Sequence, residues 1–374
     1  MSGPTNTVRV TGHAYPWDVL GDQAFADRVA RLGVSTVALA AAYHATRAAT
    51  PLHPGRQVVD ARYAALYRPV HERVWSGRRL RPCPPDWMST SDSFGAAADV
   101  LRAAGLRVSA WVVLTHNTRL GTENPDVSVV NCFGENYAYA LCPSWPEVRE
   151  YAALLAREAA RDADEVSLEA CGQLGVDHGS HHDKTQGAWD PDARRWLSVC
   201  CCAACQAGWS ARGLDPPWVV STLRDAIRAE SSGLVGVVPF ADALLATRHA
   251  ATDALRAEVL AALAVAVTLH AHPDPWETGS SPGLTASAAE SVASLTVPAW
   301  STAPETADLV AAAVRTGRPV DAYVTVLPPA DPADVPAHGA RLRDAGATGL
   351  SLYHLGLAPR WRHPLLRELV RAGT

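Results

Sequence analysis

Four segments of the chain repeat one pattern of hydrophobic and polar positions. In each, an alanine-rich amphipathic stretch ends in arginine and glycine, and a run rich in β-branched residues follows at once, as in Arg31–Gly33 before residues 34–39. The pattern recurs at 102–114, 315–326 and 343–354. Glycine after the last helical turn favours the left-handed conformation that ends a helix, so a strand can begin directly. Repeated helix-to-strand units predict parallel strands joined by helical crossovers.

Alternation of these elements predicts an α/β protein with eight strands and eight helices. It favours a single (β/α)8 TIM barrel over residues 1–374 rather than a doubly wound sheet. Two connections are long, about 43–93 after the second strand and the one after the fourth strand. Ser144 and Glu147 fit a capping box at the start of one helix. The strands are expected near 7–12, 35–41, 108–114, 165–170, 264–270, 292–297, 320–326 and 349–354, and the helices near 22–32, 94–104, 147–162, 217–230, 241–261, 304–316, 335–345 and 363–371.

Composition and charge limit the classes of molecule that the protein is expected to bind. The chain has 374 residues, 48% of them hydrophobic, and a net charge of −5. There is no basic stripe, which argues against nucleic acid and anionic membranes as partners. The start of the sequence lacks a basic segment followed by an apolar one, and no apolar run reaches the ~20 residues that a membrane helix needs. We therefore expect a cytoplasmic protein whose cysteines are reduced or bound to metal.

Active sites of TIM barrels lie at the carboxyl ends of the strands. The predicted strand ends supply aromatic, imidazole and amide side chains, which suit a neutral polyhydroxylated ligand because sugars offer C–H faces to rings and hydroxyls to polar groups. No glycine-rich phosphate loop is found in the sequence. We predict a small-molecule carbohydrate as the substrate. The predicted substrate-binding residues are His13, Trp17, Tyr43, His44, Arg47, Trp111, His116, Asn117, His178, His270, Trp300, Tyr353 and His354.

Glu169 is the best-placed acid. Ser167 and Glu169 share one face of the predicted fourth strand, so both can face the barrel axis or its mouth. A partly desolvated carboxyl there can have a raised pKa and act as a general acid. The alternative interpretation is a structural carboxylate that bridges to a neighbouring arginine.

Cys200, Cys202 and Cys205 form a Cys-x-Cys-x-x-Cys group after the fourth strand. Zinc favours such soft ligands in closed tetrahedral sites, so the spacing predicts a structural zinc ion. The fourth ligand is open among Cys132, Cys142, Cys171 and a histidine. Reduced, buried thiols without metal are the alternative.

The loop between the fourth strand and the cysteines is rich in histidine. It contains His178, His181, His182 and Asp183. His-x-x-His spacing is poor for one helix face, so a catalytic metal here is less favoured than a solvated loop or contact with substrate hydroxyls. A second loop, residues 131–137, lies between the third strand and its helix and is a candidate lid or subsite.

The order of these features resembles that of glycoside hydrolases of barrel fold. A strand ending in Glu169 is followed by a loop, the Cys-x-Cys-x-x-Cys group, Trp209 and the segment 213–216 with the sequence Gly-Leu-Asp-Pro. More remotely, it is similar to the zinc-containing β-galactosidases and the α-L-fucosidase-like barrels. Two departures matter. Retaining barrels of the β-galactosidase kind carry a second glutamate at the end of strand 7, where this chain has Val326-Leu327-Pro328, and the fucosidase-like barrels use aspartate on strand 4.

The resemblance implies a glycosidase that acts on a small sugar or glycoside by carboxylate acid/base catalysis, without a catalytic cofactor. Glycosidases normally use two carboxyl groups, ~5 Å apart for retention or ~6.5–9.5 Å apart for inversion. The second could be Asp183, Asp177, Glu135 or Glu277. One alternative is a metal-dependent isomerase or hydrolase on the same barrel. Another is a catalytically inactive barrel that only binds carbohydrate. The isomerase would use as ligands His116, Glu169, His270 and His272.

Overall fold

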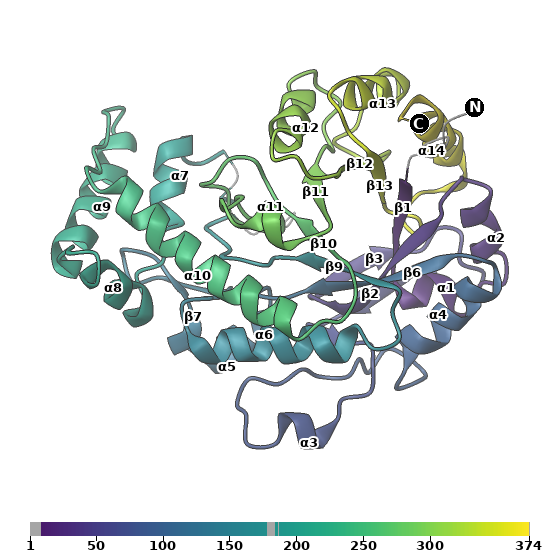
Figure 1. Ribbon diagram of the computed structural model, residues 1–374, viewed down its shortest axis with the longest axis horizontal. Coiled ribbons are helices and arrows are strands. Elements are labelled where there is room, and N and C mark those ends of the chain that lie inside the picture. Colours follow the sequence, from purple (N-terminus) through teal and green to yellow (C-terminus); the bar gives the residue numbers. More distant parts are fainter. Residues whose placement is uncertain (1–8, 178–183, 186, 374) are drawn as a thin grey trace.

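Eight parallel strands form a closed barrel in the computed structural model, which describes residues 9–177, 184–185 and 187–373 (Figure 1). The first strand pairs with both the second and the last, and this closes the barrel. The predicted TIM barrel is therefore confirmed, with each strand at its expected place. The strands are β1 (Arg9–Ala14), β2 (Thr36–Tyr43), β6 (Arg107–Val113), β9 (Glu165–Glu169), β10 (Val267–His270), β11 (Ser294–Pro298), β12 (Val320–Thr325) and β13 (Gly349–Tyr353).

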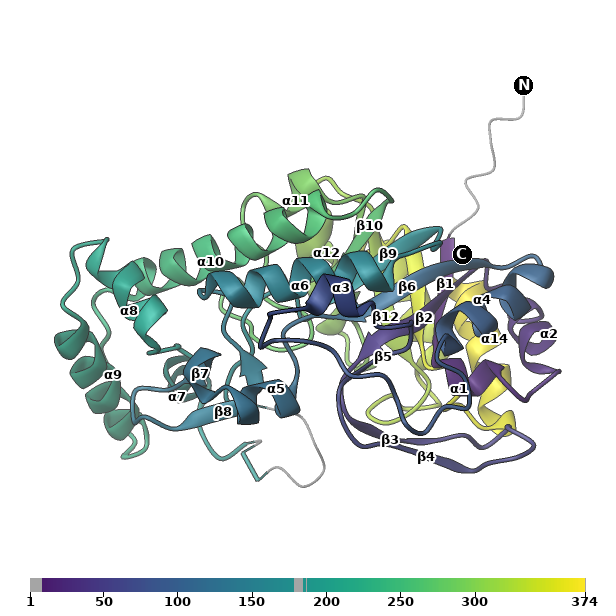
Figure 2. The same ribbon diagram turned by 90° about the horizontal axis from the view of Figure 1, so that it is seen from below.

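Helices follow most of these strands and cover the barrel (Figures 1 and 2). Gly33 and Gly346, after two of the helices, have φ angles of 80° and 96°. The predicted left-handed helix ends are thus confirmed at these positions. The covering helices are α1 (Pro16–Val19), α2 (Phe25–Ala30), α4 (Ser93–Ala103), α6 (Pro146–Ala159), α12 (Thr306–Val314), α13 (Val335–Asp344) and α14 (His363–Gly373), the last preceded by the 3-10 turn η2 (Arg360–Arg362).

The helices predicted at 217–230 and 241–261 are confirmed, and both lie between β9 and β10. The crossover from β10 to β11, for which no helix was predicted, carries the four-residue helix α11 (Ala288–Ser291). The predicted capping box at α6 is wrong, since Trp145 is the N-cap residue and no side chain caps the helix. Ser144 Oγ lies instead 3.1 Å from the sulfur of Cys205.

Three insertions extend from the carboxyl ends of β2, β6 and β9. The long connections predicted after the second and fourth strands are confirmed, as the first and third insertions. The second insertion, after β6, was not predicted to be long. The first insertion contains β3 (Thr46–Ala49), β4 (Val58–Ala61), β5 (Ala65–Leu66) and α3 (Glu72–Trp75). The second contains α5 (Thr118–Glu123), η1 (Pro125–Val127), β7 (Ser128–Val130) and β8 (Asn136–Leu141). The last contains α7 (Pro191–Leu197), α8 (Ala203–Ser210), α9 (Pro216–Glu230) and α10 (Ala241–Ala261).

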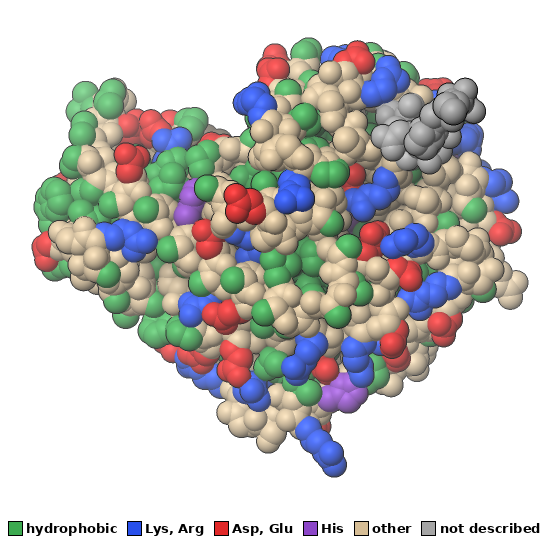
Figure 3. Space-filling model, in the orientation of Figure 1, with side chains coloured by type: hydrophobic (Ala, Val, Ile, Leu, Met, Phe, Trp, Pro, Cys, Tyr) green, Lys and Arg blue, Asp and Glu red, His purple; other side chains and the backbone are tan. Residues whose placement is uncertain are grey.

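The second and third insertions form a lobe beside the barrel, with α10 packed along α6 (Figure 2). In Figure 3 the surface is hollowed between this lobe and the part of the barrel that carries α12 and α13. Hydrophobic side chains gather on the outer end of the lobe in the same view. None of the helices in the described part of the chain is long and apolar enough to cross a membrane.

The interior of the barrel is unusually polar. TIM-barrel interiors are mostly filled by branched aliphatic side chains. Here Arg9 forms an ion pair with Asp321 at the amino-terminal end. Higher up, Ser167 Oγ lies 3.0 Å from His270 Nε2, and an equivalent serine–histidine contact joins β13 to β1. Because buried polar groups need hydrogen-bond partners, these pairs stabilise a polar column that leads from the floor of the barrel to Glu169.

Candidate active site at the carboxyl end of the barrel

Glu169 is the last residue of β9 and faces the interior of the barrel. Its side chain is almost fully buried, with the residue 6% exposed, and Trp111 Nε1 donates a hydrogen bond of 2.8 Å to Glu169 Oε2. Burial raises the pKa of the Glu169 carboxyl to about 7, although the hydrogen bond from Trp111 opposes part of the rise. The ion pair expected of a structural carboxylate occurs lower on the same strand, where Glu165 lies 3.6 Å from Arg9. Glu169 therefore has the environment of a general acid.

Neutral hydroxyl groups surround this carboxyl. Burial, above all, raises the pKa of Tyr323 on β12, and the nearby Glu169 carboxyl contributes to the rise. The pKa of Tyr43 and that of Tyr353 are raised for the same first reason. The ring of Tyr43 meets that of Trp111 edge-on, with 4.5 Å between centroids. Glu169 is thus faced by tyrosines that remain protonated at neutral pH and can donate hydrogen bonds.

Two buried imidazoles lie at the base of the same region. His13 Nε2 lies 2.8 Å from Ser351 Oγ, and His270 binds Ser167 in the same way. The Nδ1 atom of each ring is buried and has no hydrogen-bond partner among the described residues. Burial lowers the pKa of His270 to about 3. Burial also lowers the pKa of His13 well below its ordinary value. Both rings are neutral at pH 7 and retain one unused polar atom each.

The accessible aromatic surface lies further out. Trp300 stacks on Tyr353 with 4.8 Å between ring centroids and an interplanar angle of 24°, and both residues are half-buried. His44 and His116 stack on each other at 4.3 Å and are half-buried too. These four rings, predicted as substrate contacts, therefore present part of their surface at the carboxyl end of the barrel.

Other predicted residues have different surroundings. Trp17 and Trp111 were predicted to stack on a sugar, but neither has any exposed surface. Trp17 packs on Tyr15 in the core at 4.4 Å, while Trp111 binds Glu169 through its indole nitrogen. Asn117 is the N-cap residue of α5, where its Oδ1 accepts a 3.0 Å hydrogen bond from the backbone of Leu120. These contacts engage the side chains structurally, and direct sugar contact by the two tryptophans stays a prediction.

The remaining predicted substrate contacts differ in position. Arg47 is exposed on the β3–β4 hairpin, outside the barrel sheet. His178 and the candidate carboxyl Asp183 lie outside the described residues. The loop histidines His181 and His182 do so as well.

The candidates for the second carboxyl have their own partners. Asp177 lies 2.6 Å from Arg194 Nε. Glu135 is exposed in the turn between β7 and β8, where Asn131 Nδ2 donates a 2.7 Å hydrogen bond to it. Glu277 lines an open cleft of about 110 Å³ beside Asp177 and Arg194. No contact in the described structure joins one of these three to Glu169, so they remain predictions.

Sequence reasoning missed a second buried carboxyl. Asp18, in the short helix after β1, is 3% exposed, and burial raises its pKa to about 7. Its Oδ2 accepts a 2.8 Å hydrogen bond from the backbone nitrogen of Tyr15 and lies 3.8 Å from His354 Nδ1. The period of two along β1 selects His13, Tyr15 and Trp17, and it fails at Asp18 because α1 has already begun there.

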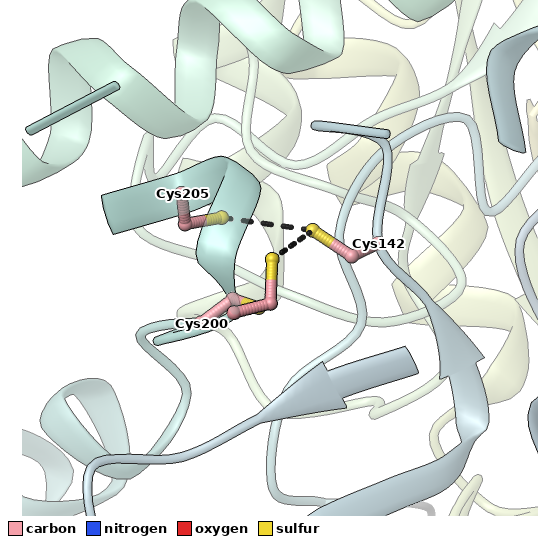
Figure 4. A group of neighbouring side chains, drawn as sticks. Cys142, Cys200 and Cys205 are labelled. Carbon is pink, nitrogen blue, oxygen red and sulfur yellow. Dashed lines mark hydrogen bonds between the residues drawn. The ribbon is translucent and has the colours of Figure 1, made fainter. Parts of the chain in front are cut away.

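Four cysteines meet in the lobe (Figure 4). The sulfur atoms of Cys142, Cys200, Cys202 and Cys205 all lie within 4.8 Å of one another and are buried. Cys142 Sγ is 3.6 Å from Cys205 Sγ and 3.7 Å from Cys202 Sγ. Zinc–sulfur bonds of about 2.3 Å in a tetrahedron separate the sulfurs by about 3.8 Å. The four thiols therefore fit a structural zinc ion.

Cys142, just after β8, supplies the fourth thiol of the group and is the candidate fourth ligand among those that the sequence left open. Contacts with Cys142, Cys200 and Cys205 hold the pKa of Cys202 well below its ordinary value. A thiolate within the group is the form that binds metal. Cys132 and Cys171 lie outside the group, and burial raises their pKa values to about 11 and about 12. Burial therefore keeps both thiols protonated.

The ligand set of the isomerase alternative is not assembled. Among the described side chains, the cysteines form the group of His, Cys, Asp and Glu that is tight enough to share an ion. His270 is bound to Ser167, and His272 Nδ1 accepts a hydrogen bond from the backbone of Asp274 at 3.0 Å. The described geometry therefore favours proton transfer by Glu169 over metal chemistry at the barrel mouth.

No protein-family model and no curated protein matches the sequence. Several solved structures resemble its fold. α-L-Fucosidase isoenzyme 2 from Paenibacillus thiaminolyticus matches with 13% identity and a TM-score of 0.56, over 97% of this chain and 48% of that chain. The catalytic domain of β-amylase from Paenibacillus polymyxa matches with 11% identity and a TM-score of 0.59, over 99% of both chains. The β-galactosidase from Marinomonas ef1 matches with 12% identity and a TM-score of 0.53, over 97% of this chain and 59% of that chain.

These likenesses concern the fold. The chain spans about half the length of the fucosidase and somewhat more of the β-galactosidase, but the full length of the amylase domain. The resemblance to barrel-fold glycoside hydrolases that the sequence predicted is confirmed at the level of the fold: this chain is a TIM barrel of the kind found in a fucosidase, an amylase and a β-galactosidase.

Proposed function

We propose that the protein is a glycosidase that acts on a small neutral sugar or glycoside, with Glu169 as its acid/base carboxyl. The observation that carries the proposal is the position of Glu169, buried at the carboxyl end of the fourth barrel strand and bound to Trp111 at 2.8 Å. A carboxyl with a pKa near neutrality can protonate the oxygen of a leaving group and later accept a proton. The fold shared with three carbohydrate-active enzymes supports the same proposal.

The surroundings of Glu169 favour a neutral ligand. Tyrosine hydroxyls and the unpartnered nitrogens of His13 and His270 can bind sugar hydroxyls without adding charge. Trp300 and Tyr353 offer half-buried rings for the C–H face of a sugar. We propose that the second carboxyl is one of Asp177, Asp183, Glu135 and Glu277. We also propose a reducing compartment such as the cytoplasm, because all eight cysteines are unpaired.

The direct test is hydrolysis of a panel of aryl α- and β-glycosides of neutral hexoses, pentoses and deoxyhexoses. Release of the aryl group by the wild-type protein, and its loss in Glu169→Gln, would support the proposal. Calorimetric binding of the same sugars without turnover would overturn it in favour of a carbohydrate-binding barrel.

Activity is expected to survive brief chelation. The cysteine group lies in the lobe rather than at Glu169, and the histidines proposed as isomerase ligands bind other residues. Treatment with a mild chelator that leaves the zinc content unchanged should therefore leave kcat within about twofold of its starting value. Immediate loss of activity, restored by manganese, cobalt or magnesium, would instead favour the metal-dependent alternative.

Activity is also expected to fall as the pH rises through about 7. A general acid must carry its proton, and burial raises the pKa of Glu169 to about that value. Trp111→Phe removes a hydrogen bond that lowers this pKa, so the alkaline limb of kcat/KM should move to higher pH. The measurement is kcat/KM from pH 5 to 9 for both proteins. Activity that rises through pH 7 would assign Glu169 the role of a base or nucleophile in the rate-limiting step.

A further inference from the structure

Asp18 and His354 form a buried pair just after the carboxyl ends of the first and the last strand of the barrel. Asp18 Oδ2 lies 3.8 Å from His354 Nδ1, and the two residues are 3% and 0% exposed. Asp18 Oδ1 and His354 Nε2 are both buried without a hydrogen-bond partner among the described residues. A Cβ atom at Gly356 would lie 2.1 Å from Asp18 Cγ, so the chain after β13 packs directly on the carboxyl. Two orphaned polar atoms in one tightly packed contact indicate a function beyond packing.

A backbone hydrogen bond favours one tautomer of His354 while Asp18 is protonated. The nitrogen of Gly356 donates a 3.1 Å hydrogen bond to Nδ1, so this ring nitrogen carries no proton. In a neutral imidazole the proton is then on Nε2, which is a donor. Burial lowers the pKa of His354 to about 3, which keeps the ring neutral. The two ring nitrogens lie on opposite sides of the imidazole, so the Nε2–H group faces away from Asp18.

The charges around Asp18 come from several elements. Arg56 in the β3–β4 hairpin and Arg28 on α2 favour its ionised form, whereas Asp22 disfavours it. The charges of Glu169 and, less strongly, of Asp18 contribute to the raised pKa of Tyr353 on β13. Desolvation outweighs these charges, so Asp18 gains or loses its proton near neutral pH. The same tyrosine therefore lies within range of both buried carboxyls.

His354 belongs to the layer of rings around Glu169. It stacks on Tyr15 with 4.3 Å between centroids and lies 6.2 Å from the ring of Trp111, the residue that binds Glu169. The Nε2–H group of His354 is therefore a buried donor in the layer of side chains around Glu169. An ionised Asp18 beside the lone pair of Nδ1 would favour a proton on Nδ1, and the neutral ring would then have none on Nε2.

We propose that Asp18 is a positioning residue that acts through His354: in its protonated form it keeps the Nε2–H group of His354 as a hydrogen-bond donor to a hydroxyl of the substrate. When Asp18 releases its proton to solvent, the imidazole proton moves from Nε2 to Nδ1 and the ring stays neutral. The role toward substrate rests on the proposed glycosidase function, whereas the coupling between Asp18 and His354 does not.

Nuclear magnetic resonance of the full chain labelled with ¹⁵N-histidine tests the coupling without any substrate. Long-range ¹H–¹⁵N correlations report which ring nitrogen carries the proton, and His354→Gln identifies the signals. We expect the Nε2–H pattern at pH 6 and a shift toward the Nδ1–H pattern with a midpoint near pH 7. In Asp18→Asn, the amide oxygen can still accept from Tyr15 and the side chain stays neutral at every pH, so the Nε2–H pattern should persist to pH 9.

Asp27→Asn is the matched control, because Asp27 is an exposed aspartate on α2. The His354 signals of this variant should change with pH as they do in the wild-type protein. His354 signals that do not move between pH 6 and 9, or that move equally in Asp18→Asn, would overturn the pair. If Asp18→Asn fails to fold, the wild-type titration alone still decides whether the tautomer changes.

The effect on substrate is measured in the Glu169→Gln background, where Glu169 no longer titrates. The probe is the aryl glycoside that the wild-type protein hydrolyses best. Loss of one neutral hydrogen bond corresponds to roughly 2- to 10-fold in binding. In Glu169→Gln, the Kd should rise by this factor between pH 6 and pH 9. In the double variant that also carries Asp18→Asn, the Kd should be the same at both pH values. A Kd that does not change with pH in either protein, together with His354 signals that do change, would overturn the contact with substrate and leave the role of Glu169 untouched. If no glycoside is hydrolysed by the wild-type protein, the proposed function is contradicted instead.

Discussion

Replacing Glu169 by glutamine is expected to lower kcat at least ~10²-fold on any glycoside that the protein hydrolyses. Glutamine preserves the shape of the side chain and can still bind Trp111, but it cannot deliver or accept a proton. Positioned acid/base groups typically contribute ~10²–10⁴-fold in rate. The measurement is steady-state kinetics at pH 6, where the Glu169 carboxyl of the wild-type protein is largely protonated.

The loss should be chemical rather than structural. At pH 6 the thermal stability and zinc content of Glu169→Gln should match those of the wild-type protein, because a neutral amide replaces a largely neutral acid. Glu290→Gln is a suitable control, since Glu290 is an exposed glutamate on α11, which precedes the amino-terminal end of β11, and it should retain full activity. Azide rescue of Glu169→Ala would indicate a nucleophilic role. Turnover near the wild-type value in Glu169→Gln would remove this residue from the mechanism.

The barrel could be predicted because its signals are local. Most strands are short hydrophobic runs, and glycines such as Gly33 and Gly346 mark where the preceding helices end. Parallel strands at that spacing need crossovers, which limits the topology to few choices. The helix between β10 and β11 was not predicted, because a four-residue helix has no periodic pattern that could be recognised. The predicted number of eight helices was reached because two of them lie between β9 and β10.

Glu169 was predictable for the same reason, since its strand face follows from the period of two and its position from the end of β9. Burial by other segments could not be predicted. Trp17 and Trp111 follow the same strand-end rule, yet tertiary packing covers both completely. Asp18 could not be predicted, because it is packed against Gly356 and His354, which lie more than 330 residues away in the sequence.

The cysteine group separates most clearly what the sequence predicts from what depends on tertiary packing. Cys200, Cys202 and Cys205 are close in sequence, and their spacing predicts a metal site. Cys142 lies in a different insertion, after β8, so its selection over Cys132 and Cys171 depends on how the two insertions pack. Ser144 Oγ, 3.1 Å from Cys205 Sγ, also serves this group rather than the predicted helix cap.

Replacing Cys142 by serine is expected to abolish zinc binding and destabilise the lobe. Cys142 comes from the insertion after β6, and the other three cysteines come from the insertion after β9, so an ion held by all four would link the two insertions (Figure 4). Structural zinc sites contribute ~10–16 kcal/mol of apparent binding free energy at neutral pH. One kcal/mol corresponds to ~2–4 °C in Tm for chains of 150–250 residues, so the fall in Tm should reach at least ~10 °C.

The measurements are elemental analysis of protein purified without added metal, thermal unfolding and hydrogen exchange. The wild-type protein should hold about one zinc per chain, and Cys142→Ser close to none. A strong chelator should lower the Tm of the wild-type protein to that of the variant and leave the variant unchanged. Cys83→Ser is the matched control, because Cys83 is half-buried and lies outside the group, and it should keep both zinc and Tm. Faster exchange should appear first in the two insertions and only later in the barrel strands, because the ion would stabilise their contact and not the sheet. Equal zinc content and equal Tm in Cys142→Ser and the wild-type protein would show that the four thiols are a buried cluster without metal.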